Sequence, residues 1–423
     1  MKGLKLSLVI MAAALLTIGL GGMAYAFHDG GVANCESCHT MHNSIGGLKV
    51  LKAGSQFTGV ASLLKGSDPS STCISCHSGA TLSGKNVFTS TSINVQGAAP
   101  VNYTPGGDFA WLTKTTFGTS IPGERLGHNV VAGDFLLVAD AVLKVAPGGT
   151  YKNTDLSCIS CHDPHPKARV DSTYTIVYPT AGAVGVPIYK SGSYGDAPTA
   201  TEAVGTYRLL GGKNYVPKSV GTPLFQYDPP VAVAPSTYNR METSTDTRVA
   251  YGTGMSEWCA NCHGSIHADS VSANFIHPAS SAAGAQLGTT IAANYNMYKK
   301  SGDLSGSSVN SYTSLVPFEE GLGLSAANIT TLKAYADPGN ATSTTGPSGT
   351  ENVMCLTCHR AHASGFKNIT RWNNSEFITQ AGVYSPPSGG MTTTEYQAAM
   401  YDRPTSMFAT YQRSLCNKCH VKD

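Results

Sequence analysis

Residues 158–165 read Cys-Ile-Ser-Cys-His-Asp-Pro-His, and they contain the pattern that decides the fold of this chain. The first five residues form a Cys-x-x-Cys-His motif, which occurs six times and uses all 12 cysteines. Two thiols at this spacing can bond to the two vinyl groups on one edge of a haem, and the adjacent histidine then faces the iron. The motif therefore predicts six covalently attached haem c groups.

The motif also identifies the residues that hold these groups. The predicted attachment cysteines are Cys35, Cys38, Cys73, Cys76, Cys158, Cys161, Cys259, Cys262, Cys355, Cys358, Cys416 and Cys419. The predicted proximal iron ligands are His39, His77, His162, His263, His359 and His420. No cysteine remains outside the motifs, which excludes a cysteine nucleophile and a redox dithiol, and no catalytic residue is predicted.

Two other uses of paired cysteines explain the pattern less well. Exported proteins often join their cysteines in disulfides, but disulfides do not require a histidine after every second cysteine. Zinc sites also use Cys-x-x-Cys, but they do not need histidine at one fixed position in six copies. Haem attachment accounts for the cysteines and the histidines together.

The first 26 residues are typical of a secretory signal peptide. Lys2 and Lys5 precede an apolar run over 6–20, and Ala24-Tyr25-Ala26 is a small-x-small cleavage site. The run is shorter than the ~20 residues that a membrane anchor needs. We expect an exported chain with a signal peptide over 1–26, a single hexahaem cytochrome c domain over 27–423, and no transmembrane segment after cleavage.

The overall charge argues against a nucleic-acid-binding protein. Charged residues make up 13% of the chain and the formal net charge is +2. Proteins that bind nucleic acids normally carry a basic stripe, and no run of lysine and arginine occurs in this sequence.

Seven histidines outside the motifs are candidate second axial ligands: His28, His42, His128, His165, His267, His277 and His362. Six haems need six such ligands, so one histidine is spare. A haem with two histidine ligands has no open position, which favours electron transfer over binding of a small substrate. Three of the seven follow a proximal histidine by three residues, a spacing that suits ligation of a neighbouring haem.

The segments between the motifs predict an irregular fold. The motifs are unevenly spaced, which excludes a solenoid of fixed period, and the intervening chain is rich in Gly, Pro, Ser, Thr and Asn. We expect mostly coil with short helices and few strands, wrapped around a chain of six stacked haems. Residues 326–335 and 393–401 favour short helices, while 130–145 and 173–178 have strand character.

Five stretches resemble the OmcS-type hexahaem cytochromes, which are outer-surface proteins of metal-reducing bacteria. They are Phe27-His-Asp-Gly-Gly-Val leading into Cys35-Glu-Ser-Cys-His-Thr-Met-His-Asn-Ser, Gly127-His-Asn-Val-Val-Ala-Gly-Asp, Ala234-Pro-Ser-Thr-Tyr-Asn-Arg, Gly254-Met-Ser-Glu-Trp-Cys-Ala-Asn-Cys-His and Tyr411-Gln-Arg-Ser-Leu-Cys-Asn-Lys-Cys-His. The resemblance covers nearly the whole chain after the signal peptide. It implies that every haem has two histidine ligands, and that His42 ligates the fifth haem of the adjacent subunit.

The same resemblance implies a function. It implies a non-enzymatic, extracellular protein at the outer cell surface that polymerises into conductive filaments. Such a protein takes electrons from redox partner cytochromes and passes them to metal oxides, electrodes or partner cells. Two alternatives stay open from the residues alone: a monomeric periplasmic electron shuttle, and a multihaem oxyanion reductase, which needs one iron with an open position.

Overall fold

The structure is a computed structural model, and it describes most of the chain after the first motif begins. The described residues are 35–40, 44–45, 48–49, 63–79, 86–89, 99–101, 103–113, 125–179, 186–217, 225–235, 248–267, 279–281, 286–309, 311, 316–337, 345–374, 377–386 and 391–420. Within these residues, no helix is long and apolar enough to cross a membrane.

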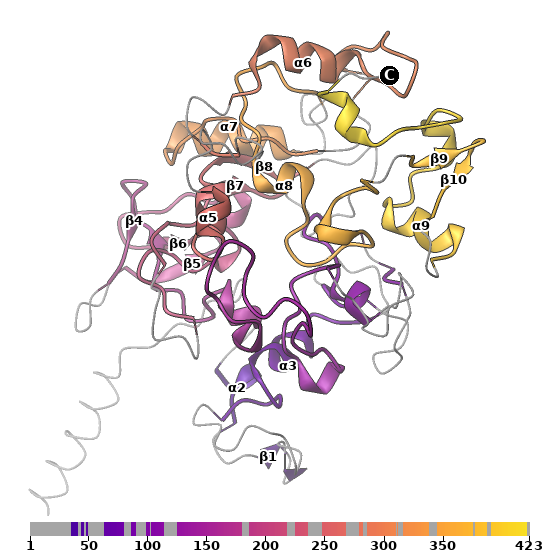
Figure 1. The fold of residues 1–423 in the computed structure, drawn as a ribbon. Helices are drawn as coiled ribbons and strands as arrows, with labels where there is room; N and C mark the ends of the chain where they lie inside the picture. Colours follow the sequence, from indigo (N-terminus) through magenta and orange to yellow (C-terminus); the bar gives the residue numbers. More distant parts are fainter. Residues whose placement is uncertain are drawn as a thin grey trace, which may run out of the picture.

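Helices in the described residues are short and are separated by long irregular segments (Figure 1). They are α2 Cys35–Cys38, α3 Pro69–Ile74, α4 Met255–Cys259, α5 Gly264–His267, α6 Gly288–Met297, α7 Ala326–Ala336, α8 Cys355–Cys358 and α9 Thr393–Ala399. Figure 1 shows α2 and α3 at one end of the molecule and α6 with the C-terminal residues at the other. The chain thus progresses from one end to the other.

Strands are shorter still. They are β1 Ser44–Ile45, β2 Leu48–Lys49, β3 Arg169–Val170, β4 Ile176–Val177, β5 Ile188–Lys190, β6 Ala203–Gly205, β7 Val231–Val233, β8 Ala250–Thr253, β9 Thr379–Gln380 and β10 Val383–Tyr384. One sheet has four strands in the order β4-β3-β6-β5, in which only β5 and β6 are parallel, and the other sheets are antiparallel pairs. The predicted architecture, mostly coil with short helices and few strands, is therefore confirmed.

The main hydrophobic core is rich in aromatic side chains. Trp111, Phe366 and Tyr396 are buried in it, and the rings of Phe366 and Tyr396 meet edge to face with centres 5.3 Å apart. Cysteines of the third, fifth and sixth motifs, Cys158, Cys358 and Cys419, pack against this core. The core therefore supports the motifs from several parts of the sequence at once.

The two predicted helices are confirmed as α7 and α9. Both begin at a capping residue, because Ser325 accepts a hydrogen bond from Asn328 N and Thr392 forms a capping box with Glu395. Such caps satisfy backbone N–H groups that have no partner inside the helix. Capping explains why these segments become helical in a chain that is otherwise largely irregular.

The strand predictions were less successful. Residues 173–178 contain the two-residue strand β4, but the prediction for 130–145 was wrong, since this fully described segment contains no strand. It forms a 3₁₀ turn over Gly133–Phe135, and Leu136 follows with a φ of 59°. A left-handed residue interrupts extended backbone, so the alternating apolar side chains do not align on one face.

Asp108 is expected to be a large contributor to the stability of the fold. Its buried carboxylate accepts hydrogen bonds from Thr89 N at 3.2 Å, Thr89 Oγ1 at 2.6 Å and Ala110 N at 2.8 Å. Asp108→Ala leaves these donors unpaired and should lower the free energy of unfolding by about 3 kcal/mol. Chemical denaturation of the haem-loaded protein measures this loss.

Asp171 provides the matched control for this prediction. Its carboxylate also accepts three hydrogen bonds, from Thr173 N, Thr173 Oγ1 and Thr175 N, but at an exposed site. Water can replace the lost acceptor there, so Asp171→Ala should cost about 1 kcal/mol or less. Equal losses in the two variants would contradict the role assigned to burial.

Candidate haem centres

Each of the six motifs forms one helical turn with the same backbone hydrogen bond. In every copy the N–H of the histidine donates to the carbonyl oxygen of the first cysteine, at 2.8–3.1 Å. The turns of the first and fifth motifs are α2 and α8, and α3 and α4 lead into the second and fourth. A single turn brings the three side chains of a motif to neighbouring positions on the helix surface, which suits attachment to one haem.

Consecutive motifs interact through their cysteines, in the order of the sequence. The interacting side chains are Cys38 with Cys76, Cys73 with Cys158, Cys161 with Cys262, Cys259 with Cys355, and Cys358 with Cys416 and Cys419. Second cysteines interact with each other across the first and third junctions, and first cysteines do so across the second and fourth. Across the fifth junction, Cys358 interacts with both cysteines of the sixth motif. Groups attached at these sites would follow one another along the molecule in sequence order.

Burial disfavours the thiolate form of two motif cysteines, Cys262 and Cys358. Burial raises the pKa of Cys262 to about 11 and that of Cys358 to about 12, with the nearby Cys416 and Cys419 adding to the latter shift. These thiols therefore stay protonated near neutral pH. None of the twelve cysteines is joined in a disulfide.

Three pairs of histidine rings face each other across similar gaps. Ring centres are 6.0 Å apart for His39 and His165, 6.1 Å for His128 and His263, and 6.4 Å for His162 and His362. Two imidazoles that bind one metal ion from opposite sides, each at about 2 Å, place their ring centres about 6 Å apart. Each pair joins one motif histidine to one candidate second ligand, so the spacing fits a haem iron between them.

Four histidines of these pairs, and His359 of the fifth motif, are held in the same orientation by backbone carbonyl groups. The ring Nδ1 lies 2.7 Å from Ala361 O in His128, 2.8 Å from Arg208 O in His162, 2.8 Å from Pro147 O in His263, 2.7 Å from Asn368 O in His359 and 3.2 Å from Gly107 O in His362. An Nδ1–H that donates to a carbonyl leaves the Nε2 lone pair available for a metal.

Burial keeps two of the candidate second ligands neutral. Burial lowers the pKa of His128 to about 4, aided by the facing His263, and lowers that of His362 to about 3, aided by the facing His162. Only a neutral imidazole nitrogen can bind a metal ion. Both rings are therefore in the form that ligation requires at physiological pH.

Close backbone packing positions His128 and His362. The N–H of His128 donates to His362 O at 2.9 Å, and the N–H of His362 donates to Gly106 O at 2.7 Å. Gly107 has a φ of +86°, and a Cβ at this position would lie 1.9 Å from Ala363 O. Only glycine fits there, and this close approach brings two distant segments together so that each presents a histidine.

A turn built on Asp163 positions His165. The carboxylate of Asp163 accepts hydrogen bonds from His165 N at 3.0 Å and from Lys167 N at 3.1 Å, and its side chain is almost fully buried. His165 then faces His39 of the first motif rather than His162, three residues before it. Sequence reasoning missed Asp163, although an Asp-Pro pair inside a turn was the available signal.

Other candidate ligands are not placed. His28, His42 and His277 lie outside the described residues. His267 ends α5, and its side chain also lies outside the described part of the chain. Sequence reasoning could not have found the carbonyl partners of the rings, because any residue type can supply a backbone carbonyl.

Comparisons with known proteins identify close relatives, although no family model matches the chain. The chain is 49% identical over 445 residues to C-type cytochrome OmcS of Geobacter sulfurreducens, with 100% of both chains covered. It is similar to the cryo-EM structure of the OmcS nanowires from Geobacter sulfurreducens, with a TM-score of 0.80, 48% identity, 94% of this chain covered and 100% of that chain. A structure of the Outer Membrane Cytochrome S filament from the same organism gives a TM-score of 0.80 and 49% identity over the same shares.

Proposed function

Because this chain belongs to the family of the OmcS c-type cytochromes, we propose that it is a hexahaem electron carrier that assembles into filaments and delivers electrons outside the cell. The observation that carries this proposal is the sequence-ordered row of motifs, together with the three facing histidine pairs. A continuous row of metal centres without open positions suits electron transfer along a molecule.

The twelve motif cysteines would hold six haems, and the six motif histidines would bind their irons. We assign His165 as second ligand of the haem at Cys35 and Cys38, His362 at Cys158 and Cys161, and His128 at Cys259 and Cys262. His28, His267 and His277 are the candidates for the second and sixth haems. When bound, each haem supplies an iron that alternates between the ferric and ferrous states, and the protein sets its orientation and surroundings.

The two described histidines that lie three residues after a motif histidine, His165 and His362, each face the histidine of an earlier motif. His165 follows the third motif and faces the first, and His362 follows the fifth motif and faces the third. Each therefore serves the haem two positions earlier. His42 follows the first motif. In a row of subunits with six haems each, the haem two positions before a first haem is the fifth haem of the neighbouring subunit, at Cys355, Cys358 and His359. This agrees with the family resemblance and supports a filament in which ligation crosses each subunit boundary.

The proposed location is the outer cell surface, with partner cytochromes as electron donors and metal oxides, electrodes or other cells as acceptors. A reductase needs an iron with an open position. The neutral, oriented rings of His128 and His362 instead favour two ligands on their irons. A monomeric shuttle would have no use for a cross-subunit ligand.

His42→Ala is the test of this proposal. The variant should leave the fifth haem with one histidine ligand and should fail to form filaments, as seen by negative-stain electron microscopy of protein sheared from cells. His165→Ala is the matched control, because it removes one ligand from a haem whose pair lies within one subunit. Long filaments from His42→Ala, with every haem still low-spin, would overturn the cross-subunit role.

A further inference from the structure

Glu319 is a buried carboxyl group that the electron-transfer machinery described so far does not use. Its side chain is 0% exposed. Its Oε1 accepts a hydrogen bond from Met255 N at 2.6 Å, at the start of α4. Its Oε2 has no hydrogen-bond partner among the described residues. A buried carboxylate with an unpaired oxygen is costly, and protonation removes that cost.

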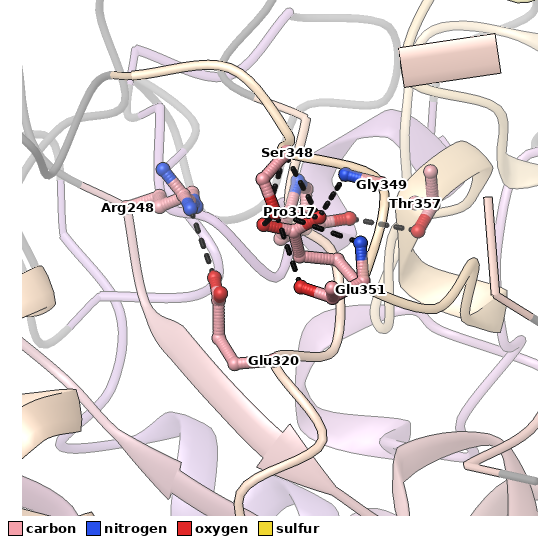
Figure 2. Close-up of polar contacts among 8 residues, drawn as sticks. Arg248, Pro317, Glu320, Ser348, Gly349, Glu351 and Thr357 are labelled. Atoms are coloured by element: carbon pink, nitrogen blue, oxygen red, sulfur yellow. Dashed lines mark hydrogen bonds and ion pairs between the residues drawn. The ribbon is translucent and has the colours of Figure 1, made fainter. Parts of the chain in front are cut away.

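This carboxyl lies between the fourth and fifth attachment sites. Helix α4 ends at Cys259, the first cysteine of the fourth motif. Ser256 of the same helix accepts a hydrogen bond from Cys355 N at 3.1 Å, and the side chains of Cys259 and Cys355 interact. On the other side, Thr357 Oγ1 of α8 donates to Pro317 O at 2.7 Å, which fixes the segment that carries Glu319 (Figure 2).

The backbone around Glu319 is rigidly paired. Glu319 N donates to Asn352 O at 2.9 Å, and Asn352 N donates to Glu319 O at 2.8 Å. A bridge to Tyr251 of β8 holds the other side. This pairing fixes the backbone position of Glu319, whose side chain is fully buried.

The charged groups around Glu319 favour its neutral form. Burial raises the pKa of Glu319 to about 7. The N–H groups of Met255 and Ser256 oppose this shift, while Glu257 of α4 and Cys355 of α8 add to it. The adjacent Glu320 is already paired with Arg248, Nη2 to Oε1, at 3.1 Å. Figure 2 shows this pair and shows Glu351 bound to Ser348 and Gly349. Glu320 therefore has a charged partner of its own, and Glu351 has hydrogen-bond donors of its own.

We propose that Glu319 is a proton-binding site linked to the oxidation state of the haems attached by the fourth and fifth motifs. When one of these irons gains an electron and passes from ferric to ferrous, the Glu319 carboxylate takes one proton from water and becomes a carboxylic acid. When the iron is oxidised, the electron leaves to the next acceptor and the proton returns to water. This inference rests on the proposed function, because it needs haems at these motifs.

The test is potentiometric titration of the haem-loaded protein between about pH 6 and 8. This range brackets the raised pKa of Glu319. An electrode supplies the electrons. In the wild type, the midpoints of two haems should fall as pH rises, by at most about 59 mV per unit, which is the tenfold change in proton concentration converted for one electron. Infrared difference spectra should show a protonated carboxyl band that appears on reduction and shifts in heavy water.

Glu319→Gln should flatten the pH slope of those two haems and abolish the carboxyl band. The matched control is Glu351→Gln. Burial raises the pKa of Glu351, but hydrogen bonds from Ser348 and Gly349 lower it further, so the pKa lies below its ordinary value. This carboxylate therefore stays ionised over the whole pH range of the titration. The control variant should therefore keep both the slope and the band.

Three outcomes would overturn the inference. One is an unchanged slope in Glu319→Gln. Another is the absence of a protonated carboxyl band from the wild type, which needs no variant to fold. A third is a pH dependence of the midpoint potentials that appears only after a chelator removes divalent cations. That result would indicate that the Glu257 and Glu319 carboxylates bind a cation instead of a proton. Failure of the proposed function is distinguishable, since it would appear as fewer than six haems in the wild type.

Discussion

In a chain that lacks the third haem, His362→Ala should produce no additional high-spin haem, whereas His165→Ala should still produce one. The background is Cys158→Ala with Cys161→Ala, which removes both attachment points. The reason is the ring pairing, since His362 faces His162 of the third motif and His165 faces His39 of the first. In the wild-type background, each single variant should turn one haem in six high-spin.

Electron paramagnetic resonance of the ferric protein counts the high-spin haems, and carbon monoxide binding to the reduced protein counts the open positions. The design is a double-mutant cycle, so an effect that vanishes in one background identifies the haem that the histidine serves. A new high-spin haem from His362→Ala in the chain without the third haem would contradict the assignment.

Loss of the third haem should also stop electron flow along the filament. The third motif interacts with the second through Cys158 and with the fourth through Cys161, so it links the two halves of the row. Cys158→Ala with Cys161→Ala should remove one sixth of the haem and reduce filament conductance to the background level. Current between electrodes bridged by single filaments measures this loss.

The control for the conductance experiment is Ile159→Val, which changes the same motif but keeps both cysteines and His162. It should keep six haems and the wild-type current. Filaments with five haems per subunit that still conduct like the wild type would contradict a continuous row in sequence order.

The helical turns of the six motifs can be predicted from the sequence because they depend on local residues. Two cysteines and a histidine within five residues determine one helical turn, and all six copies form it with the same hydrogen bond. Helices α7 and α9 are predictable for the same reason, since Ser325 and Thr392 cap them locally.

The pairing of histidines is not predictable from one sequence. His362 meets His162 only because Gly107 allows the segment around Ala363 to approach closely. Spacing shows that a histidine three residues after a motif must serve another haem, but packing between distant segments decides which one. The strand predicted over 130–145 failed for a related reason, because the left-handed backbone at Leu136 overrides the apolar pattern.

The most direct test of the whole account is a helical cryo-EM reconstruction of the protein sheared from the cell surface. The account predicts filaments with six haems per subunit in sequence order, His165 and His39 on the first iron, His362 and His162 on the third, and His42 of each subunit on the fifth iron of its neighbour. Dispersed single subunits, or a fifth iron ligated within its own chain, would contradict it.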